Sequence, residues 1–174
     1  IAASAGLLGG GGGSEQKPAQ TFAVGMTGAL VALNLPIAGC GRGELVIEIR
    51  SGGVNGPVLA TIRRAAADVP PAYSGFVTFD LDTPLRVRRS QLLAFTVRTE
   101  GPDSYCSYAT SEPGDTYPGG EYYFDSRPNP PGWLSSKDFP GPPDLPFQTL
   151  MGNLAPPPPP PASSAGCLIL GPGG

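Results

Sequence analysis

Histidine is absent from this chain of 174 residues, and only 14% of the residues are charged. Without histidine the chain lacks the commonest general base and the commonest neutral metal ligand. The formal net charge of -3 predicts no basic face for a nucleic acid. We therefore expect a protein that is not an enzyme and that has no cofactor, no metal and no nucleic-acid partner.

Long hydrophobic runs are also missing. No apolar stretch reaches the length of about 18 residues that a spanning helix needs, so we expect no membrane span. The chain begins at Ile1, without an initiator methionine or the basic segment that opens a signal peptide. This beginning is typical of a mature product whose signal has been removed, or of a fragment.

Cysteine occurs only at Cys40, Cys106 and Cys167, and no CxxC spacing indicates a zinc site. In a secreted protein, a bond between Cys40 and Cys106 would close a loop of about 66 residues and stabilise the fold by about 4 kcal/mol. In a reducing compartment the two would be small buried thiols. Cys167 is left over, either as an intermolecular bridge or reactive thiol, or as a small apolar side chain buried with its neighbours.

Glycine and proline, in contrast, are abundant, with 26 and 23 residues. Such a content without a period is typical of low-complexity chains, but much of it lies at 9–13 and 156–161. The composition therefore predicts a glycine-rich N-terminal arm at 1–19, one domain at 20–154, and a polyproline spacer with an apolar tail at 155–174.

The domain consists of short alternating runs separated by turn residues. The clearest is ELVIEIR at 44–50, in which Leu45, Ile47 and Ile49 alternate with Val46, Glu48 and Arg50. About nine such runs without a convincing helix predict an all-β fold, an antiparallel and jelly-roll-like β-sandwich. The expected strands are 20–24, 29–37, 44–50, 58–64, 75–81, 91–99, 103–109, 122–124 and 144–150, with a loop at 65–74 and a connector at 82–90.

The segment GDTYPGGEYYFDSRPNPPGW, residues 114–133, concentrates aromatic side chains between proline and glycine turns. Tyr122, Tyr123 and Phe124 have the composition of a strand. Because side chains alternate along a strand, we expect Tyr122 and Phe124 on one face and Tyr123 on the other.

The aromatic residues of this region support two interpretations. They form either an exposed platform for sugar rings or packing within the core and between strands. The candidates are Tyr105, Tyr108, Tyr117, Tyr123 and Trp133, of which we select Tyr117, Tyr123 and Trp133 as possible ligand aromatics.

Acidic residues gather in the same region, at Asp103, Glu112, Asp115, Glu121 and Asp125. Such oxygen ligands hold calcium in some proteins, and paired carboxylates cleave glycosides. Because the dense spacing of a calcium loop is absent, we favour a solvated acidic edge and predict no metal site.

Five motifs together resemble a β-sandwich module of secreted bacterial proteins whose function is unassigned, often found near cell-surface anchoring signals. They are ELVIEIR, GPVLATI, GDTYPGG, FDSRPNPPGW and DLPFQTL. The resemblance covers about 20–152. It implies an extracellular jelly-roll-like fold and a disulfide between Cys40 and Cys106, and it implies no activity.

The two arms lie outside that resemblance and predict assembly. Six prolines at 156–161 are expected to form a polyproline rod of roughly 19 Å, and the apolar residues Cys167, Leu168, Ile169 and Leu170 follow them in the sequence. Ile1, Leu7 and Leu8 make the N-terminal arm a rival donor.

We therefore predict a secreted, extracellular or cell-surface structural subunit. It would build a filament or layer with other copies of itself by docking a terminal arm on a neighbouring copy as a donor strand. The alternative is a carbohydrate-binding cell-surface module with glycans as partners.

Overall fold

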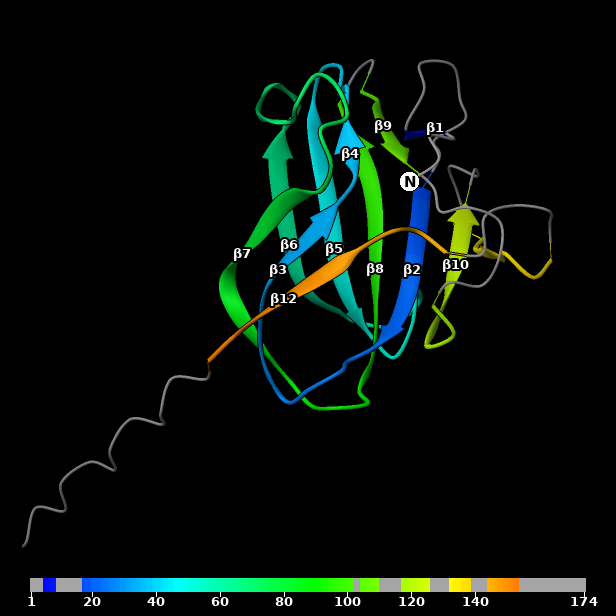
Figure 1. The fold of residues 1–174 in the computed structure, drawn as a ribbon. Coiled ribbons are helices and arrows are strands. Elements are labelled where there is room, and N and C mark those ends of the chain that lie inside the picture. The colour runs from blue at the N-terminus through cyan, green and yellow to red at the C-terminus, as the bar shows by residue number, and fades with distance from the viewer. Residues whose placement is uncertain are drawn as a thin grey trace, which may run out of the picture.

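The computed structural model describes residues 5–8 (backbone only), 17–101, 104–109, 117–125, 132–138 and 144–153. Antiparallel strands account for almost all the regular structure of these residues (Figure 1). They are β1 (Ala5–Leu8), β2 (Lys17–Ala23), β3 (Gly28–Leu35), β4 (Ile37–Ala38), β5 (Glu44–Ser51), β6 (Val58–Ala65), β7 (Val77–Val87), β8 (Leu92–Glu100), β9 (Cys106–Ala109), β10 (Gly120–Asp125), β11 (Leu134–Ser135) and β12 (Gln148–Gly152). The expected all-β, antiparallel sandwich is confirmed. In the described part of the chain, no helix is long and apolar enough to cross a membrane.

The strands form two layers. One layer is a six-stranded sheet in the order β11-β10-β2-β8-β5-β6. The other contains two three-stranded sheets, β12-β3-β7 and β1-β9-β4. Pro36 separates β3 from β4, and because proline has no backbone donor, the chain changes its pairing here from β7 and β12 to β9. In Figure 1 the strands β3, β7 and β12 cross in front of the six-stranded sheet.

Strict alternation along β5 and β8 places apolar side chains between the layers. Leu45, Ile47 and Ile49 are at most 1% exposed, and Phe95 on the neighbouring strand is fully buried. Tyr122 and Tyr123 point to opposite faces of the sheet, as expected. Tyr122 belongs to this core, whereas Tyr123 packs on a second apolar cluster. The core thus depends on the pattern that the sequence displays most clearly.

Four aromatic rings join the layers at the centre of the molecule. The ring of Phe147, just before β12, lies 5.3 Å from Phe22, 5.4 Å from Phe95 and 5.4 Å from Tyr117, measured between centroids. Phe22 and Phe95 approach to 6.3 Å. Tilted and edge-on arrangements at these distances are favourable for aromatic pairs, so this cluster fixes where the chain enters β12.

A buried polar contact holds the segment before β12 in place. Gln20 and Asp144 are at most 2% exposed, and the amide Nε2 of Gln20 donates to Asp144 Oδ1 at 3.0 Å. The Leu145 N–H donates to Gln20 Oε1 at 2.9 Å, and the Tyr117 N–H donates to Asp144 Oδ2 at 2.9 Å. Buried polar groups satisfied in this way specify one arrangement of the chain.

Some expected boundaries differ from the structure. The expected connector at 82–90 is wrong, since β7 continues to Val87. The register of its pairing with β3 shifts between Leu30 and Ala32. At this irregularity β7 has more residues than β3, and Pro84 is among them. β7 lies at the edge of its sheet, where proline is tolerated. β2 begins at Lys17, so the expected domain boundary at residue 20 falls inside this strand.

We predict that Phe95→Ala lowers the free energy of unfolding by about 3–5 kcal/mol, because it removes the ring that touches both Phe22 and Phe147 and leaves a cavity. Chemical denaturation followed by circular dichroism measures the change. Leu92→Ala on the same strand is the control, since Leu92 is 43% exposed. Equal effects of the two substitutions would contradict this description of the core.

Candidate functional site

β9 is a short strand that is joined to the rest of the domain along one edge by a disulfide, by β4 and by backbone hydrogen bonds. Cys106 at its start is bonded to Cys40, which confirms the predicted disulfide. The Gly41 N–H donates to the Tyr105 carbonyl at 2.8 Å, and the Ala109 N–H donates to the Pro36 carbonyl at 3.0 Å. β4 pairs with the same side of β9. One edge of β9 is therefore occupied by the body of the domain.

The N-terminal arm occupies the other edge of β9. The backbone of β1 pairs with it in antiparallel register, with Leu7 opposite Ser107 and Leu8 opposite Cys106. Residues 9–16, whose sequence is GGGGGSEQ, connect β1 to β2. The N-terminal arm is therefore paired with a sheet edge of its own chain, and its donation to a neighbouring copy stays a prediction.

The other predicted assembly residues are not placed. Ile1 and the C-terminal residues Cys167, Leu168, Ile169 and Leu170 lie outside the described residues. The C-terminal donor therefore stays a prediction.

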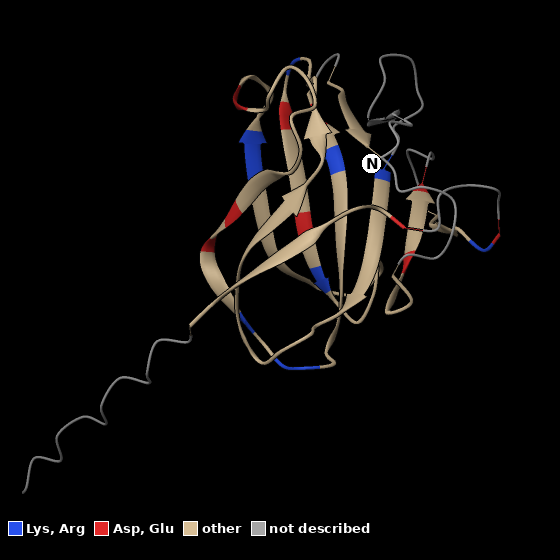
Figure 2. Cartoon of the chain, viewed as in Figure 1, with Lys and Arg blue, Asp and Glu red and all other residues tan. Residues whose placement is uncertain are grey.

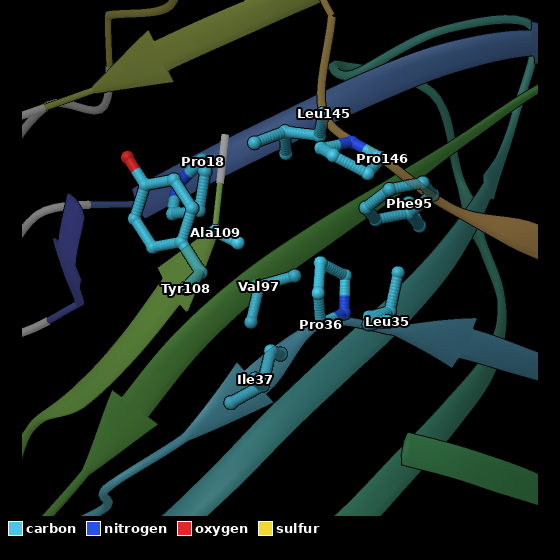
Figure 3. Close-up of a pocket in the computed structure, with 10 residues that line it drawn as sticks. All are labelled: Pro18, Leu35, Pro36, Ile37, Phe95, Val97, Tyr108, Ala109, Leu145 and Pro146. Atoms are coloured by element: carbon cyan, nitrogen blue, oxygen red, sulfur yellow. The ribbon is translucent and has the colours of Figure 1, made fainter. Parts of the chain in front are cut away.

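A small apolar hollow lies between the layers near the end of β9 (Figure 3). Figure 3 shows Tyr108 and Ala109 of β9 beside Pro18, with Leu145 nearby. Its free volume is about 20 Å³, which is about enough for one water molecule. The hollow is a packing defect of the core rather than a ligand site.

The three predicted ligand aromatics do not form one platform. Tyr117 belongs to the interior, where its ring packs on Phe147 and its hydroxyl donates to the Ala23 carbonyl at 3.0 Å. Tyr123 and Trp133 instead pack on a small apolar cluster that contains Ala19. Ala19 belongs to the face of the six-stranded sheet that is turned away from the core, which we call the outer face.

The outer face carries a hollow of about 230 Å³, which we call the outer-face hollow. This volume lies below the range of about 300–1,000 Å³ that is typical of ligand sites. Figure 2 shows basic segments on β2 and β8, which are neighbouring strands of the six-stranded sheet. The polar and aromatic residues that line it include Lys17, Glu48, Arg50, Asn55, Arg98 and Trp133.

An ion-pair network crosses this face. Glu48 accepts hydrogen bonds from Arg50 and, at 2.7 Å, from Arg98 Nη1. Arg98 Nη2 also donates to Glu100 at 2.7 Å, and Arg63 bridges Glu100 and Glu44 at 2.8 and 2.9 Å. Burial alone would raise the pKa of Glu48, but hydrogen bonds and charges from Arg98 and Arg50 hold this pKa below its usual value. Glu48 therefore remains an anion between two guanidinium groups.

Sequence reasoning missed this group of residues. It placed Glu48 and Arg50 on the polar side of a strand, but the pairing of Glu48 with Arg98, fifty positions away, depends on the sheet order. Of the predicted aromatics, only Trp133 lines the outer-face hollow. The alternation of charged residues within ELVIEIR is the one signal in the sequence that points to this face.

The predicted acidic edge is only partly described. Glu121 pairs with Lys137 at 3.2 Å and also bonds to Ser135. Asp125 accepts a hydrogen bond from the Gly132 N–H at 3.0 Å. Asp103, Glu112 and Asp115 lie outside the described residues. Among the residues that are described, no three side chains of the metal-binding types come together.

No family model, curated protein or solved structure matches this chain. The resemblance to a module of secreted bacterial proteins therefore stays a prediction.

The pKa of Glu48 predicts how stability changes with pH. Because the folded pKa lies below the ordinary value, the stabilisation is present above that ordinary value and is lost as the pH falls through the folded pKa. We expect Glu48→Gln to be less stable than the natural protein at neutral pH and to lose less stability between about pH 5 and about pH 3.

Urea denaturation at a series of pH values measures this difference. Asp82→Asn is the control, since Asp82 is an exposed carboxylate on β7, outside the ion-pair network. The ion-pair description of Glu48 fails if Glu48→Gln and the natural protein lose equal stability on acidification.

Proposed function

We propose that this protein is a secreted structural subunit that assembles with copies of itself into an extracellular filament or surface layer. The observation that carries the proposal is the pairing of β1 with the edge of β9. In the assembly, β1 of one copy takes the same place on β9 of the next copy.

The exchange conserves the contacts of β1. Its four residues form the same ladder whether β9 belongs to their own chain or to a neighbour, so the two states differ mainly in the entropy of the connector and of association. A short flexible connector gives the arm an effective concentration of about millimolar within its own chain. Exchange is therefore favoured where subunits are concentrated, as on a cell surface.

The connector has the composition and length for this exchange. Its five consecutive glycines, Gly9–Gly13, restrict the backbone least among the amino acids. Fully extended, residues 9–16 span roughly 28 Å. In the proposed assembly, this reach lets β1 leave its own β9 and pair with β9 of an adjacent copy.

Donation of β1 and acceptance at β9 use different surfaces of the subunit. Such a head-to-tail contact does not close on itself in a pair, and its repetition builds a fibre. Backbone hydrogen bonds supply the affinity, as in other cases where a strand is added to a sheet edge. The Cys40–Cys106 bond keeps β9 anchored and supports an oxidising, extracellular setting.

Mixed cross-linking tests the exchange directly. Leu7 and Ser107 are opposite in the ladder, and Cα atoms of opposite residues lie at about 4.5–5.5 Å, within disulfide range. We expect a chain with Leu7→Cys and a second chain with Ser107→Cys, mixed at high concentration under mild oxidation, to form a disulfide-linked heterodimer. Both chains carry Cys167→Ser to remove the odd thiol.

The control replaces Ser107→Cys with Tyr105→Cys, an exposed position that is not paired with β1. Mass spectrometry of non-reduced peptides identifies the bond. If the control pair cross-links as well as the matched pair, or if neither does, the exchange of β1 is excluded.

Truncation separates the two arms. We expect electron microscopy to show filaments or layers for the full chain and none for a chain that lacks residues 1–14, because the donor strand is gone. A chain that lacks 156–174 tests the C-terminal arm in the same way. If both truncated chains still make the same filaments, or if the full chain stays monomeric at high concentration, strand donation is wrong.

A further inference from the structure

We propose that one end of the sandwich docks on an anionic lipid surface. This end consists of the loop at 24–27, between β2 and β3, and of residues 86–91, where β7 ends and the chain leads to β8. We call it the basic end. The pairing of β3 with β7 starts here, whereas the other end of β3 leads to β4 and β9, which the proposed assembly uses. The inference is therefore independent of strand exchange.

Hydrogen bonds join the two loops of the basic end. The Val24 N–H donates to the Gln91 carbonyl at 2.9 Å, and the Ser90 N–H donates to the Val24 carbonyl at 2.8 Å. The Arg89 N–H donates to Thr27 Oγ1 at 3.0 Å. Because these bonds satisfy backbone groups of both loops, the fold holds the basic end in one arrangement before any partner arrives.

Ser90 makes a tight turn at this end. Its φ is 64°, and it is the only non-glycine residue with a positive φ among the residues that the structure describes. A left-handed conformation costs a serine free energy, and it persists where the surrounding structure enforces it, often at functional sites. The turn therefore presents the side chains of Arg88 and Arg89 on a fixed backbone.

Three arginine side chains at the basic end carry uncompensated charge. Arg86, Arg88 and Arg89 are exposed, and within the described part of the chain none of their guanidinium groups takes part in an ion pair. The loops at 24–27 and 88–91 contain no Asp or Glu. Figure 2 shows the basic segment between β7 and β8 at the lower end of the view. This end is thus positively charged, although the whole chain has a net charge of -3.

The same three arginines line an open hollow of about 760 Å³. This volume falls within the range of about 300–1,000 Å³ that is typical of ligand sites. Thr27, Ser90 and Gln91 add hydroxyl and amide groups to the lining. Guanidinium groups bind phosphate through paired N–H donors. The hollow therefore suits the phosphate of a lipid headgroup.

Exposed apolar side chains at the same end favour a lipid surface over a soluble polyanion. Met26 is 58% exposed, more than any other large apolar side chain in the described residues. The Gly52 N–H donates to the Leu92 carbonyl at 2.9 Å, which brings the loop at 52–57 to this end. Leu92 and Val58 beside it are 43% and 44% exposed. Apolar side chains enter the membrane interface while basic groups attract anionic lipids, whereas a soluble polyanion would use the arginines alone.

The test uses the full chain and measures its flotation with lipid vesicles in a density gradient. Flotation is chosen because filaments sediment on their own and do not float. We expect the chain to float with vesicles that contain about one part of anionic phosphatidylglycerol to two of phosphatidylcholine, and not with vesicles of phosphatidylcholine alone. Binding should weaken as salt is raised, because salt screens exposed charges.

Charge variants locate the surface. We expect Arg86→Gln, Arg88→Gln and Arg89→Gln each to lower the partition coefficient on anionic vesicles by about fivefold. The matched control is Arg42→Gln, which removes the same charge from an exposed arginine before β5, at the opposite end of the sandwich. This control should keep the natural partition coefficient.

An apolar variant separates the lipid surface from a soluble polyanion. We expect Met26→Ser to lower the partition coefficient by about tenfold, because its side chain no longer enters the interface. The control is Leu134→Ser, since Leu134 on β11 is 46% exposed and lies outside the basic end. Circular dichroism and Tm establish that each variant is folded.

Three results would overturn the proposal. They are the absence of flotation with anionic vesicles, equal flotation with neutral and anionic vesicles, and equal effects of Arg88→Gln and Arg42→Gln. Binding of dextran sulfate that the arginine variants lose, without flotation on vesicles, would assign the basic end to a soluble polyanion instead. Filaments without flotation would reject this surface and leave strand exchange standing.

Discussion

The contact of Phe95 with Phe22 and Phe147 is the interaction on which the arrangement of the two layers depends. Phe22 and Phe95 come from neighbouring strands of the six-stranded sheet, and Phe147 comes from the segment that leads into β12. Phe22 and Phe95 are buried and Phe147 is half-buried, and removing such rings from water is among the larger apolar contributions to the stability of a domain. The buried hydrogen bond between Gln20 and Asp144 fixes the segment before β12 on β2, and it thereby fixes where the ring of Phe147 meets the core.

The position of β9 follows from the same packing. Tyr108 of β9 and Tyr122 of β10 both reach the core, where their hydroxyls lie 3.3 Å apart. The Cys40–Cys106 bond adds a covalent link on the side of β4. The core, β4 and the disulfide therefore fix the position of β9 along one of its edges. Its other edge is left for β1, which a glycine-rich segment joins to the rest of the domain.

The outer face of the six-stranded sheet is partly covered by other parts of the chain. Ala94 points away from the core and is nevertheless fully buried, because Val54 of the loop after β5 and the side chain of Trp133 pack on it. The remainder is an ion-pair network in which Glu48 is shared by Arg50 and Arg98. The outer face thus combines a charged network with an aromatic side chain, whereas the proposed assembly uses the β9 edge in the other layer.

The sequence by itself determined the all-β class and most of the strands. It also determined which residues of β5 and β8 face the core and that Tyr122 and Tyr123 point in opposite directions. All of these follow from alternation with a period of two, which is a local property of the chain. The disulfide was predicted from a resemblance, since spacing alone left two thiols as an alternative. Only the tertiary structure decided the order of the strands, and with it the meeting of Lys17, Glu48 and Arg98 and the place of β1 on β9. Those contacts join residues far apart in the chain, and no local preference of either residue encodes its partner.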